Sequence, residues 1–259
     1  MRENGTRVKL AAGATVAGLI VPVAAPVVVD LAGLVGFDFV LIDTEHGHLG
    51  FEAAEHLVRS AEAAGVTPLA RSSSNAPAEI LRLLDLGVQG VMIPQITTEA
   101  EAERAVRAAK FYPRGERGLA SSRAAGYGLV EAQAAYVQRA NAETMVLALI
   151  EHIDAVARLD AIIAVDGIDV LFIGASDLAQ SMGHPGDAGH ADVQLAIDQI
   201  IERGVAAGRV VGVNAASGEA ARVYAERGVR FFCLSPWHHA VEAWRGYLAA
   251  LTGRQTAPR

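Results

Sequence analysis

The feature that most constrains the fold of this chain is a series of eight short apolar runs separated by alanine-rich amphipathic stretches. The runs are Ala14–Leu19, Phe39–Ile42, Thr67–Ala70, Gly90–Ile93, Met145–Ile150, Val170–Ile173, Val210–Val213 and Phe231–Leu234. The stretches between them include Phe51–Ala64, Ala76–Leu86, Thr98–Ala109, Val193–Ala207 and Gly218–Arg227. Gly65, Gly87, Gly208 and Gly228 follow four of these stretches, and glycine is favoured where a helix ends in a left-handed residue. The pattern therefore predicts strands that alternate with helices.

The apolar runs are continuous rather than alternating, which is typical of parallel strands whose two faces are both covered. Eight strand–helix units in 259 residues match the size of a (β/α)8 barrel. A doubly wound sheet is the alternative, but no G-x-G-x-x-G motif follows the first run. We therefore predict an α/β fold, a (β/α)8 TIM barrel formed by one domain of residues 1–259, with frayed ends at Met1–Thr6 and Gly253–Arg259.

The composition excludes several classes of protein. No apolar run reaches the roughly 20 residues that cross a bilayer, so we expect no membrane partner. A net charge of −7 argues against a nucleic-acid partner. The single cysteine, Cys233, lies in an apolar context and excludes an intrachain disulfide. We therefore predict a cytoplasmic protein.

Polar side chains follow most of the predicted strands at the point where each strand ends. They are Asp43, Glu45 and His46 after the second run, Arg71 after the third, Gln95 after the fourth, Glu151 and His152 after the fifth, Asp177 after the sixth, Asn214 after the seventh and Ser235 after the eighth. Catalytic residues of TIM barrels stand at the C-terminal ends of the strands. We therefore predict that these acids and the arginine converge on one rim.

The chain holds only two lysines, Lys9 and Lys110, and neither follows a predicted strand. A Schiff-base aldolase needs a lysine in the barrel mouth, so a metal ion is the natural electrophile instead. Glu151 and Asp177 are the best candidate ligands, because they follow neighbouring strands. Two carboxylates without cysteine suit a hard ion such as Mg²⁺ or Mn²⁺. The alternative is that both acids only cap helices or lie in loops.

Three other features have both a functional and a structural interpretation. His46 is either a general base or a histidine of a capped loop. Arg71 either clamps a carboxylate or an enolate oxygen or lies on the surface. The long stretch Tyr112–Gln133, rich in glycine and arginine, is interpreted as a functional loop or lid.

Six motifs in a fixed order give the chain a family resemblance. They are IDTEHG, PLAR, LLDLGVQGVMIPQI, YPRGERG, IE after a strand, and FIGASDLAQSMG. Together they resemble the HpcH/HpaI class II pyruvate aldolase family, typified by 4-hydroxy-2-oxoheptanedioate aldolase, over about residues 10 to 250. The resemblance implies an aldehyde-lyase that makes or breaks the bond between an aldehyde and the enolate of pyruvate, held on Mg²⁺, Mn²⁺ or Co²⁺.

The resemblance also implies a role for each residue that matches a motif. Glu151 and Asp177 match the metal ligands, and Arg71 matches the arginine on the enolate oxygen. The remaining matches are His46 as the active-site histidine, Asp85 as its acidic partner from this chain or a neighbouring subunit, Asp43 and Glu45 as supporting acids, and Gly174, Ala175 and Ser176 as the cradle for the pyruvate carboxylate. The family's assembly implies a homo-hexamer, a trimer of dimers, with Trp237–Leu251 as a helix exchanged between subunits.

Three positions depart from the family pattern. Leu149 replaces a glutamine two residues before the metal glutamate, Ile20 replaces a tryptophan in the first strand, and Ala175 replaces a proline. These changes affect the walls of the pocket rather than the metal ligands, so the chemistry is better predicted than the substrate.

Two alternative functions stay open at this point. A relative of macrophomate synthase type decarboxylates oxaloacetate to form its enolate and then condenses it. A barrel without catalysis binds a metal ion or a small oxo acid. The intact set of Glu151, Asp177, Arg71 and His46 argues against the second alternative.

Overall fold

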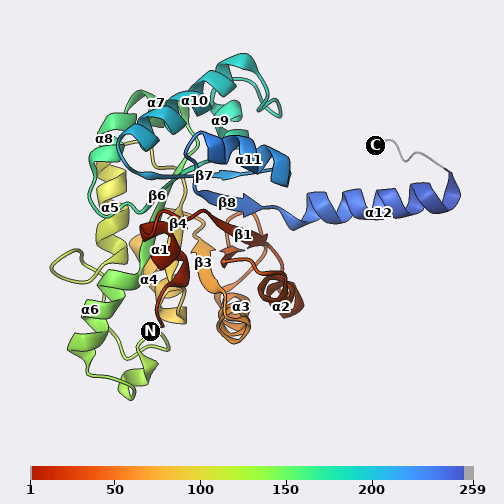
Figure 1. Ribbon diagram of the computed structural model, residues 1–259. Helices are drawn as coiled ribbons and strands as arrows, with labels where there is room; N and C mark the ends of the chain where they lie inside the picture. Colours follow the sequence, from red (N-terminus) through yellow and green to blue (C-terminus); the bar gives the residue numbers. More distant parts are fainter. Residues whose placement is uncertain (1, 254–259) are drawn as a thin grey trace.

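The computed structural model describes residues 2–253 and contains a closed barrel of eight parallel strands in sequence order. The strands are β1 (Val16–Val21), β2 (Phe39–Asp43), β3 (Thr67–Arg71), β4 (Gly90–Ile93), β5 (Met145–Ile150), β6 (Val170–Ile173), β7 (Val210–Asn214) and β8 (Phe231–Leu234). The barrel closes where Val16 of β1 pairs with Phe231 of β8. The predicted fold is confirmed (Figure 1).

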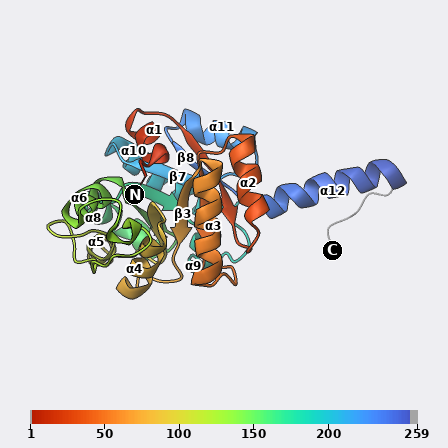
Figure 2. The same cartoon turned by 90° about the horizontal axis from the view of Figure 1, so that it is seen from below.

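Helices surround this barrel and link each strand to the next (Figure 2). They are α1 (Gly5–Ala11), α2 (Pro26–Val35), α3 (Phe51–Ala64), α4 (Pro77–Leu86), α5 (Glu99–Ala109), the 3₁₀ turn η1 (Gly126–Gly128), α6 (Gln133–Glu143), α7 (Ile153–Ala157), α8 (Leu159–Ala164), α9 (Ala175–Ser181), α10 (Ala191–Ala206), α11 (Gly218–Glu226) and α12 (Pro236–Thr252). The four glycines predicted to end helices all adopt positive φ angles. Within residues 2–253, no helix is long and apolar enough to cross a membrane.

The core has two layers, because every second strand residue points into the barrel and the others point toward the helices. Inside the barrel, the rings of Phe39 and Phe231 stack with centroids 4.4 Å apart. Phe172 meets Phe231 edge-on at 6.1 Å. A Cβ on Gly18 would lie 2.1 Å from the Phe39 ring, so this position of β1 accepts only glycine. The aromatic cluster fills the barrel and leaves the C-terminal rim for the polar residues.

The predicted bounds of the first strand and of α10 were wrong. The first strand ends at Val21 rather than Leu19, and α10 begins at Ala191 rather than Val193. The first strand begins at Val16 rather than Ala14, because Gly13 and Ala14 form the turn that ends α1, through hydrogen bonds to Leu10 and Lys9. The N-terminal end is not frayed in its described part. Asn4 caps α1 and its side-chain amide donates to the backbone oxygens of Gln89 and Glu143. Met1 and residues 254–259 lie outside the described residues.

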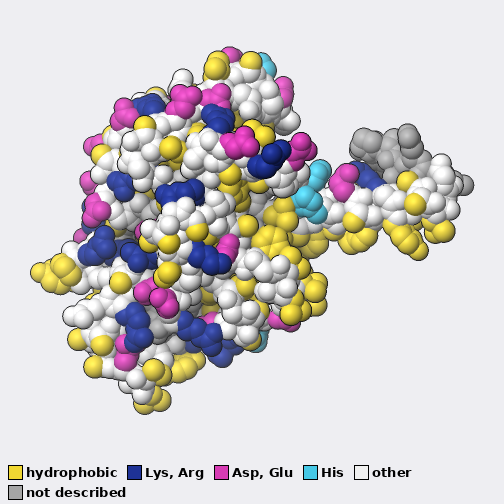
Figure 3. Space-filling view, in the orientation of Figure 1, with side chains coloured by type: hydrophobic (Ala, Val, Ile, Leu, Met, Phe, Trp, Pro, Cys, Tyr) yellow, Lys and Arg dark blue, Asp and Glu magenta, His cyan; other side chains and the backbone are white. Residues whose placement is uncertain are grey.

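The last helix, α12, extends away from the barrel in both views (Figures 1 and 2). None of its residues is buried. Its exposed apolar side chains are Trp237, Val241, Trp244, Tyr247, Leu248 and Leu251. They form a continuous apolar stripe along one side of the helix in the space-filling view (Figure 3). The helix therefore makes few contacts that would hold it in place within one chain.

Candidate active site

A cavity of about 380 Å³ opens at the C-terminal rim of the barrel. His46, Arg71, Glu151 and Asp177 all line it. Its deeper wall is apolar and is formed by Ile20, Leu41, Met92, Leu149, Phe172 and Val213. The structure thus brings the predicted ligands, arginine and histidine to one cavity, as expected from parallel strands that all end on the same rim.

Arg71 is fixed at the rim by two acids from the end of β2 and the loop after it. Asp43 and Arg71 are register partners on adjacent strands. Arg71 Nε and Nη2 donate to the two carboxylate oxygens of Asp43 at 3.0 and 2.6 Å. Nη1 lies 3.2 Å from Glu45 Oε2. Burial on its own raises the pKa of Asp43, but the hydrogen bond and the charge of Arg71 outweigh burial and lower that pKa below its ordinary value. The pair is therefore charged at neutral pH.

A guanidinium carries five N–H donors. Two of them make the hydrogen bonds to Asp43, and Nη1 faces Glu45 in an ion pair without a hydrogen bond. At least two donors remain for a ligand in the cavity. The fork is also held flat and in one orientation, because the contact to Asp43 uses two nitrogens at once. Arg71 is therefore arranged to meet a negatively charged oxygen with little loss of side-chain freedom on binding.

Glu151 is a buried carboxylate that accepts one hydrogen bond from the described residues 2–253. The backbone N–H of Gln95 donates to Glu151 Oε1 at 2.8 Å. Burial raises the pKa of Glu151 to about 7, and the charges of Glu45 and Asp177 act in the same direction. The backbone conformation of Gln95 assists this contact. Gln95 has a φ of 56°, a left-handed conformation that is uncommon outside glycine and aims its N–H at the carboxylate.

The site has a deficit of positive charge. Asp43, Glu45, Glu151 and Asp177 gather around one arginine, and burial together with the neighbouring acids raises the pKa of Glu45 as well. Glu45 Oε2 is buried and accepts no hydrogen bond in the structure. Four carboxylates with one guanidinium are a poor arrangement for an empty pocket, since like charges in a low dielectric repel strongly. The donor set therefore fits a hard divalent cation.

Glu151 and Asp177 would occupy only part of the coordination sphere of a metal ion. Among residues 2–253, Glu151 and Asp177 belong to no group of three or more His, Cys, Asp or Glu side chains whose ligand atoms lie within 4.8 Å of one another. A divalent ion held by these two carboxylates would keep coordination positions for water and for a chelating substrate, as Mg²⁺ sites commonly do. The residues present therefore fit a magnesium-like ion.

Gly174 allows the approach of Glu151. Glycine follows β6 at the point where Ile173 pairs with Ile150 of β5. A Cβ at position 174 would lie 2.7 Å from Glu151 Cβ and 3.0 Å from its Oε2. Real Cβ atoms do not approach so closely, so glycine is required here by packing rather than by its φ angle of −92°.

Gly174→Ala is expected to weaken Mg²⁺ binding by about 10-fold or more, because the added methyl group must displace the Glu151 side chain. Isothermal titration calorimetry with Mg²⁺ would measure the change. Gly218→Ala is the matched control, since a Cβ at position 218 meets no atom within 4 Å. Equal affinity in the two variants would contradict the packing argument.

His46 lies at the mouth of the cavity. Its side chain is 58% exposed, and Nε2 stands 3.8 Å from Glu45 Oε2, too far for a hydrogen bond. His152 does not line the cavity. Its Nδ1 instead accepts from the N–H of Asp154 at 3.1 Å and caps α7. Of the two histidines at strand ends, only His46 is therefore placed to reach a ligand.

Asp85 does not meet His46 within the chain. It lies near the C-terminal end of α4, and α4 returns the chain from the rim to the opposite end of the barrel. There Arg117 Nη2 donates to Asp85 Oδ1 at 2.7 Å. The predicted pairing with His46 therefore needs a second subunit and stays a prediction.

The stretch Tyr112–Gln133 is not a lid over the cavity of its own chain. It begins after α5 has returned to the N-terminal end of the barrel, and it packs there against the end of α4. Ala124 N donates to Asp85 O at 3.2 Å, and Arg123 Nη1 donates to Leu86 O at 2.8 Å. Its content of glycine and arginine predicted a functional loop or lid, but α5 carries the chain to the end of the barrel opposite the cavity before the stretch begins.

Several residues that line the cavity have no role predicted from the sequence. They are Asn214 from the end of β7, Ser235 after β8, Tyr224 from α11, and His238 and His239 from the first turn of α12. Gln95 had been placed at a strand end, but its donor role depends on an unusual φ angle that no sequence pattern announces. Because His238 and His239 belong to α12 and line the cavity, the position of α12 affects the shape of the cavity.

Known proteins with similar sequences and structures are consistent with this geometry. The family model HpcH/HpaI aldolase/citrate lyase matches residues 17–232. A hydroxypyruvate/pyruvate aldolase of Pseudomonas aeruginosa is 35% identical over 88% of this chain and 85% of the relative. A 5-keto-4-deoxy-D-glucarate aldolase of Shigella boydii is 37% identical over 80% of this chain and 79% of the relative. The crystal structure of a family protein from Burkholderia cenocepacia has a TM-score of 0.90 at 32% identity, over 96% of this chain and 99% of that one. These similarities confirm the predicted enzyme class, a carbon–carbon lyase.

Proposed function

Because this chain belongs to the HpcH/HpaI aldolase/citrate lyase family, we propose that it is a divalent-metal-dependent aldolase for 4-hydroxy-2-oxo acids. The observation that carries the proposal is the cavity in which Glu151, Asp177 and Arg71 meet. The reaction joins or separates pyruvate, reacting as its enolate, and an aldehyde. The preferred ion is of the magnesium type, Mg²⁺, Mn²⁺ or Co²⁺, because both ligands are carboxylates.

The ion would be held by Glu151 and Asp177 and would polarise the 2-oxo group of the substrate as a Lewis acid. The residues of the chain supply the remaining functions. The two free N–H groups of Arg71 stabilise the negative charge that develops on the enolate oxygen as the bond between C3 and C4 breaks. Asp43 and Glu45 hold the guanidinium in place. The backbone of Gly174, Ala175 and Ser176, at the start of α9, receives the carboxylate of the oxo acid, since the first N–H groups of a helix lack partners in the helix.

His46 moves the proton of the substrate's 4-hydroxyl group. It stands at the open end of the cavity, and an imidazole nitrogen can accept and return a proton. Asp85 from a neighbouring subunit would orient it, which is the same role that the resemblance implied. The aldehyde then departs and the enolate takes up a proton to become pyruvate.

The deeper wall of the cavity favours an apolar part of the substrate as its neighbour. Leu149 is 1% exposed, and a Cβ on Gly174 would lie 3.3 Å from its Cδ1, so it packs next to the proposed ligand Glu151. Ile20 lines the same cavity. With these two side chains the wall offers no hydrogen bond to a hydroxyl group, which disfavours substrates that bury polar groups there.

A substrate panel tests the function. Pyruvate release is measured from 4-hydroxy-2-oxo acids of different length and charge and from oxaloacetate, with Mg²⁺, Mn²⁺ or Co²⁺ and with a chelator. The proposal expects metal-dependent cleavage of at least one hydroxy-oxo acid to pyruvate and an aldehyde. Pyruvate from oxaloacetate alone, with no hydroxy-oxo acid cleaved, would replace it with the decarboxylating alternative.

The stabilising effect of Mg²⁺ is expected to grow between about pH 6 and pH 8. With a pKa of about 7, Glu151 in the metal-free protein keeps a proton that the unfolded chain has already released. Its burial therefore lowers stability as pH rises from the ordinary glutamate value through 7. Mg²⁺ binds the ionised form and offsets this loss. Melting temperatures with and without Mg²⁺ would show the trend, and Glu151→Gln should abolish it. A gain that does not vary with pH would contradict the assignment of Glu151.

The assembly we propose is a homo-hexamer, a trimer of dimers, in which α12 is exchanged between subunits. The support is the exposed apolar stripe of α12, with Trp244 62% and Tyr247 69% exposed (Figure 3). Such a stripe on a projecting helix is a typical protein-interaction surface.

Trp244→Glu is expected to reduce the assembly to smaller species, because it places a charge in the apolar stripe of α12. Light scattering coupled to size-exclusion chromatography measures the mass. Arg245→Gln, on the polar side of the same helix, is the control and should leave the mass unchanged. An unchanged mass in Trp244→Glu would exclude α12 as the main contact.

A further inference from the structure

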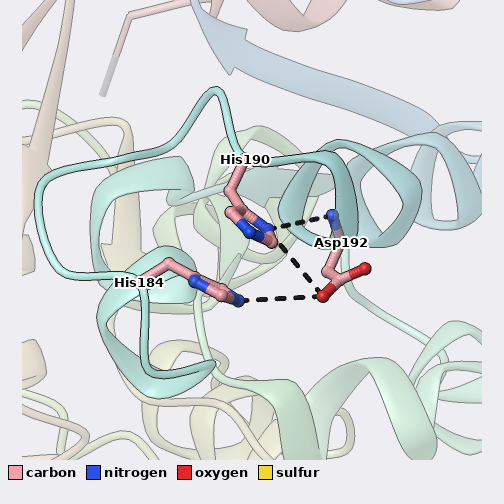
Figure 4. Close-up of side chains that lie close together, drawn as sticks. All are labelled: His184, His190 and Asp192. Atoms are coloured by element: carbon pink, nitrogen blue, oxygen red, sulfur yellow. Dashed lines mark hydrogen bonds and ion pairs between the residues drawn. The ribbon is translucent and has the colours of Figure 1, made fainter.

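A second group of metal-ligating side chains lies outside the cavity, in the connection between α9 and α10. His184 Nε2 and His190 Nδ1 each stand 3.8 Å from Asp192 Oδ2. The two imidazole rings stack with centroids 3.5 Å apart and planes 14° from parallel (Figure 4). In residues 2–253 this is the one set of three or more His, Cys, Asp or Glu side chains whose ligand atoms all lie within 4.8 Å of one another.

The backbone that carries this group is held by a chain of turns. His184 N donates to Ala179 O at 2.9 Å, Asp187 N to His184 O at 3.0 Å, and His190 N to Asp187 O at 3.1 Å. Gly183 and Gly186 supply the positive φ angles that the turns need. The three side chains are therefore presented by an ordered loop and by the first turn of α10.

The protein itself satisfies little of the bonding capacity of this group. The distances from both nitrogens to Asp192 Oδ2 exceed that of a hydrogen bond. Among the described residues, the His184 side chain makes no hydrogen bond, and its close contacts are the ring of His190 and the carboxylate of Asp192. His190 Nδ1 accepts from Asp192 N at 3.2 Å and caps α10, which leaves its Nε2 without a partner.

We propose that His184, His190 and Asp192 bind a divalent transition-metal ion of the zinc type. Two imidazoles and one carboxylate, with a water molecule as the fourth ligand, are a common zinc set. Ligand atoms of a tetrahedral zinc site lie roughly 3.3–3.5 Å apart. The 3.8 Å from each imidazole to Asp192 Oδ2 must close by a few tenths of an ångström, and all three ligand atoms lie within 4.8 Å of one another. Binding through His190 Nδ1 would replace the hydrogen bond that this atom accepts from Asp192 N. The stacked rings need to turn so that their nitrogens converge, which partly exposed side chains do at low cost.

This site differs in chemistry and in place from the one proposed for catalysis. Glu151 and Asp177 offer only oxygen atoms and suit Mg²⁺, whereas imidazole nitrogens bind Zn²⁺ strongly and Mg²⁺ weakly. Asp177 lies in the first turn of α9 and His184 follows the end of that helix. The two sites share no residue, and His184, His190 and Asp192 do not line the cavity. Binding at this site therefore ties the far end of α9 to α10, and we assign it a stabilising role.

Zinc titration of the full chain without a histidine tag tests the proposal. All zinc measurements use the double variant Glu151→Gln/Asp177→Asn as the background. In this variant, zinc bound by the two carboxylates of the cavity does not contribute to the signal. Calorimetry is expected to show one Zn²⁺ per chain, and the melting temperature should rise by at least about 3 °C with excess zinc. No binding in this background at about 100 µM zinc would overturn the proposal.

Three substitutions on that background locate the ion. His184→Ala, His190→Asn and Asp192→Asn are each expected to weaken zinc binding by more than about 10-fold. Asparagine is chosen at position 190 because it is a good helix N-cap, so α10 keeps its cap while the imidazole is lost. His56→Ala removes an exposed histidine of α3 and is the control. Unchanged zinc binding in both histidine variants would overturn the proposal even if the chain binds zinc elsewhere.

Two further readouts separate a real site from loose association. Zinc affinity should fall between about pH 7.5 and pH 5.5, because a metal ion competes with protons for imidazole. In the chain with Glu151 and Asp177 intact, His184→Ala should leave Mg²⁺-dependent turnover unchanged. Zinc affinity that does not depend on pH, or an equal loss of turnover in His184→Ala and in Asp177→Asn, would contradict a separate site.

Discussion

Glu151→Gln and Asp177→Asn are each expected to lower kcat/KM for Mg²⁺-dependent cleavage of a 4-hydroxy-2-oxo acid by more than about 100-fold. Loss of a residue that only supports a metal ligand typically costs 10–100-fold, and these variants remove a ligand itself. The fold should survive. Glutamine at position 151 can still accept the hydrogen bond that Gln95 N donates to Glu151, and it removes a buried carboxylate whose pKa is raised to about 7.

Steady-state kinetics over a range of Mg²⁺ concentrations measures this effect, and circular dichroism checks the fold. Asp154→Asn is the matched control, because Asp154 is an acid of the same segment whose side chain is 58% exposed and does not line the cavity. Retention of full metal-dependent turnover by both variants would exclude Glu151 and Asp177 as the ligands. That result would not bear on the zinc site proposed at His184, His190 and Asp192, which is tested by zinc binding rather than by turnover.

Arg71→Lys is expected to lower kcat by about 10²–10³-fold, the usual cost of removing one donor to a developing oxyanion. Lysine keeps the positive charge but not the planar fork, so it cannot make the paired contact that Arg71 Nε and Nη2 make with Asp43. Mg²⁺ affinity should change much less, because Arg71 is not a ligand. The melting temperature should fall, since Asp43 is 3% exposed and a buried acid that loses its partner destabilises the fold.

Exchange of the methyl protons of pyruvate with solvent isolates this role, because it requires the enolate but no aldehyde. We expect the exchange to slow in parallel with kcat. Arg59→Lys, at an exposed arginine paired with Glu55, is the control for the substitution itself. Exchange at the normal rate in Arg71→Lys would show that Arg71 does not stabilise the enolate.

Local sequence determined much of this fold because its signals depend on only a few neighbouring residues. Continuous apolar runs located seven strands to within one residue at either end, and the boundaries of α3 were as predicted. Thr98 and Glu101 form a capping box at the start of α5, close to the predicted start. The placement of polar residues after strands also identified Arg71, Glu151 and Asp177 as neighbours, because a parallel barrel brings all strand ends to one rim.

Other features depend on where separate parts of the chain meet, and the sequence alone did not determine them. The raised pKa of Glu151 results from burial and from acids on other strands. Asp85 and the stretch Tyr112–Gln133 lie away from the cavity because α4 and α5 carry the chain to the opposite end of the barrel.

The group of His184, His190 and Asp192 shows most simply the difference between what the sequence and what the tertiary structure determines. The sequence shows two histidines and an aspartate spread over nine residues, with nothing to indicate that their side chains meet. Turns at Gly183 and Gly186 and the cap of α10 bring the three ligand atoms within 4.8 Å of one another. The sequence determined which groups the chain carries and which segments form strands and helices. The tertiary structure decided which of those groups share a site, because the distances between side chains depend on the path of the backbone between them.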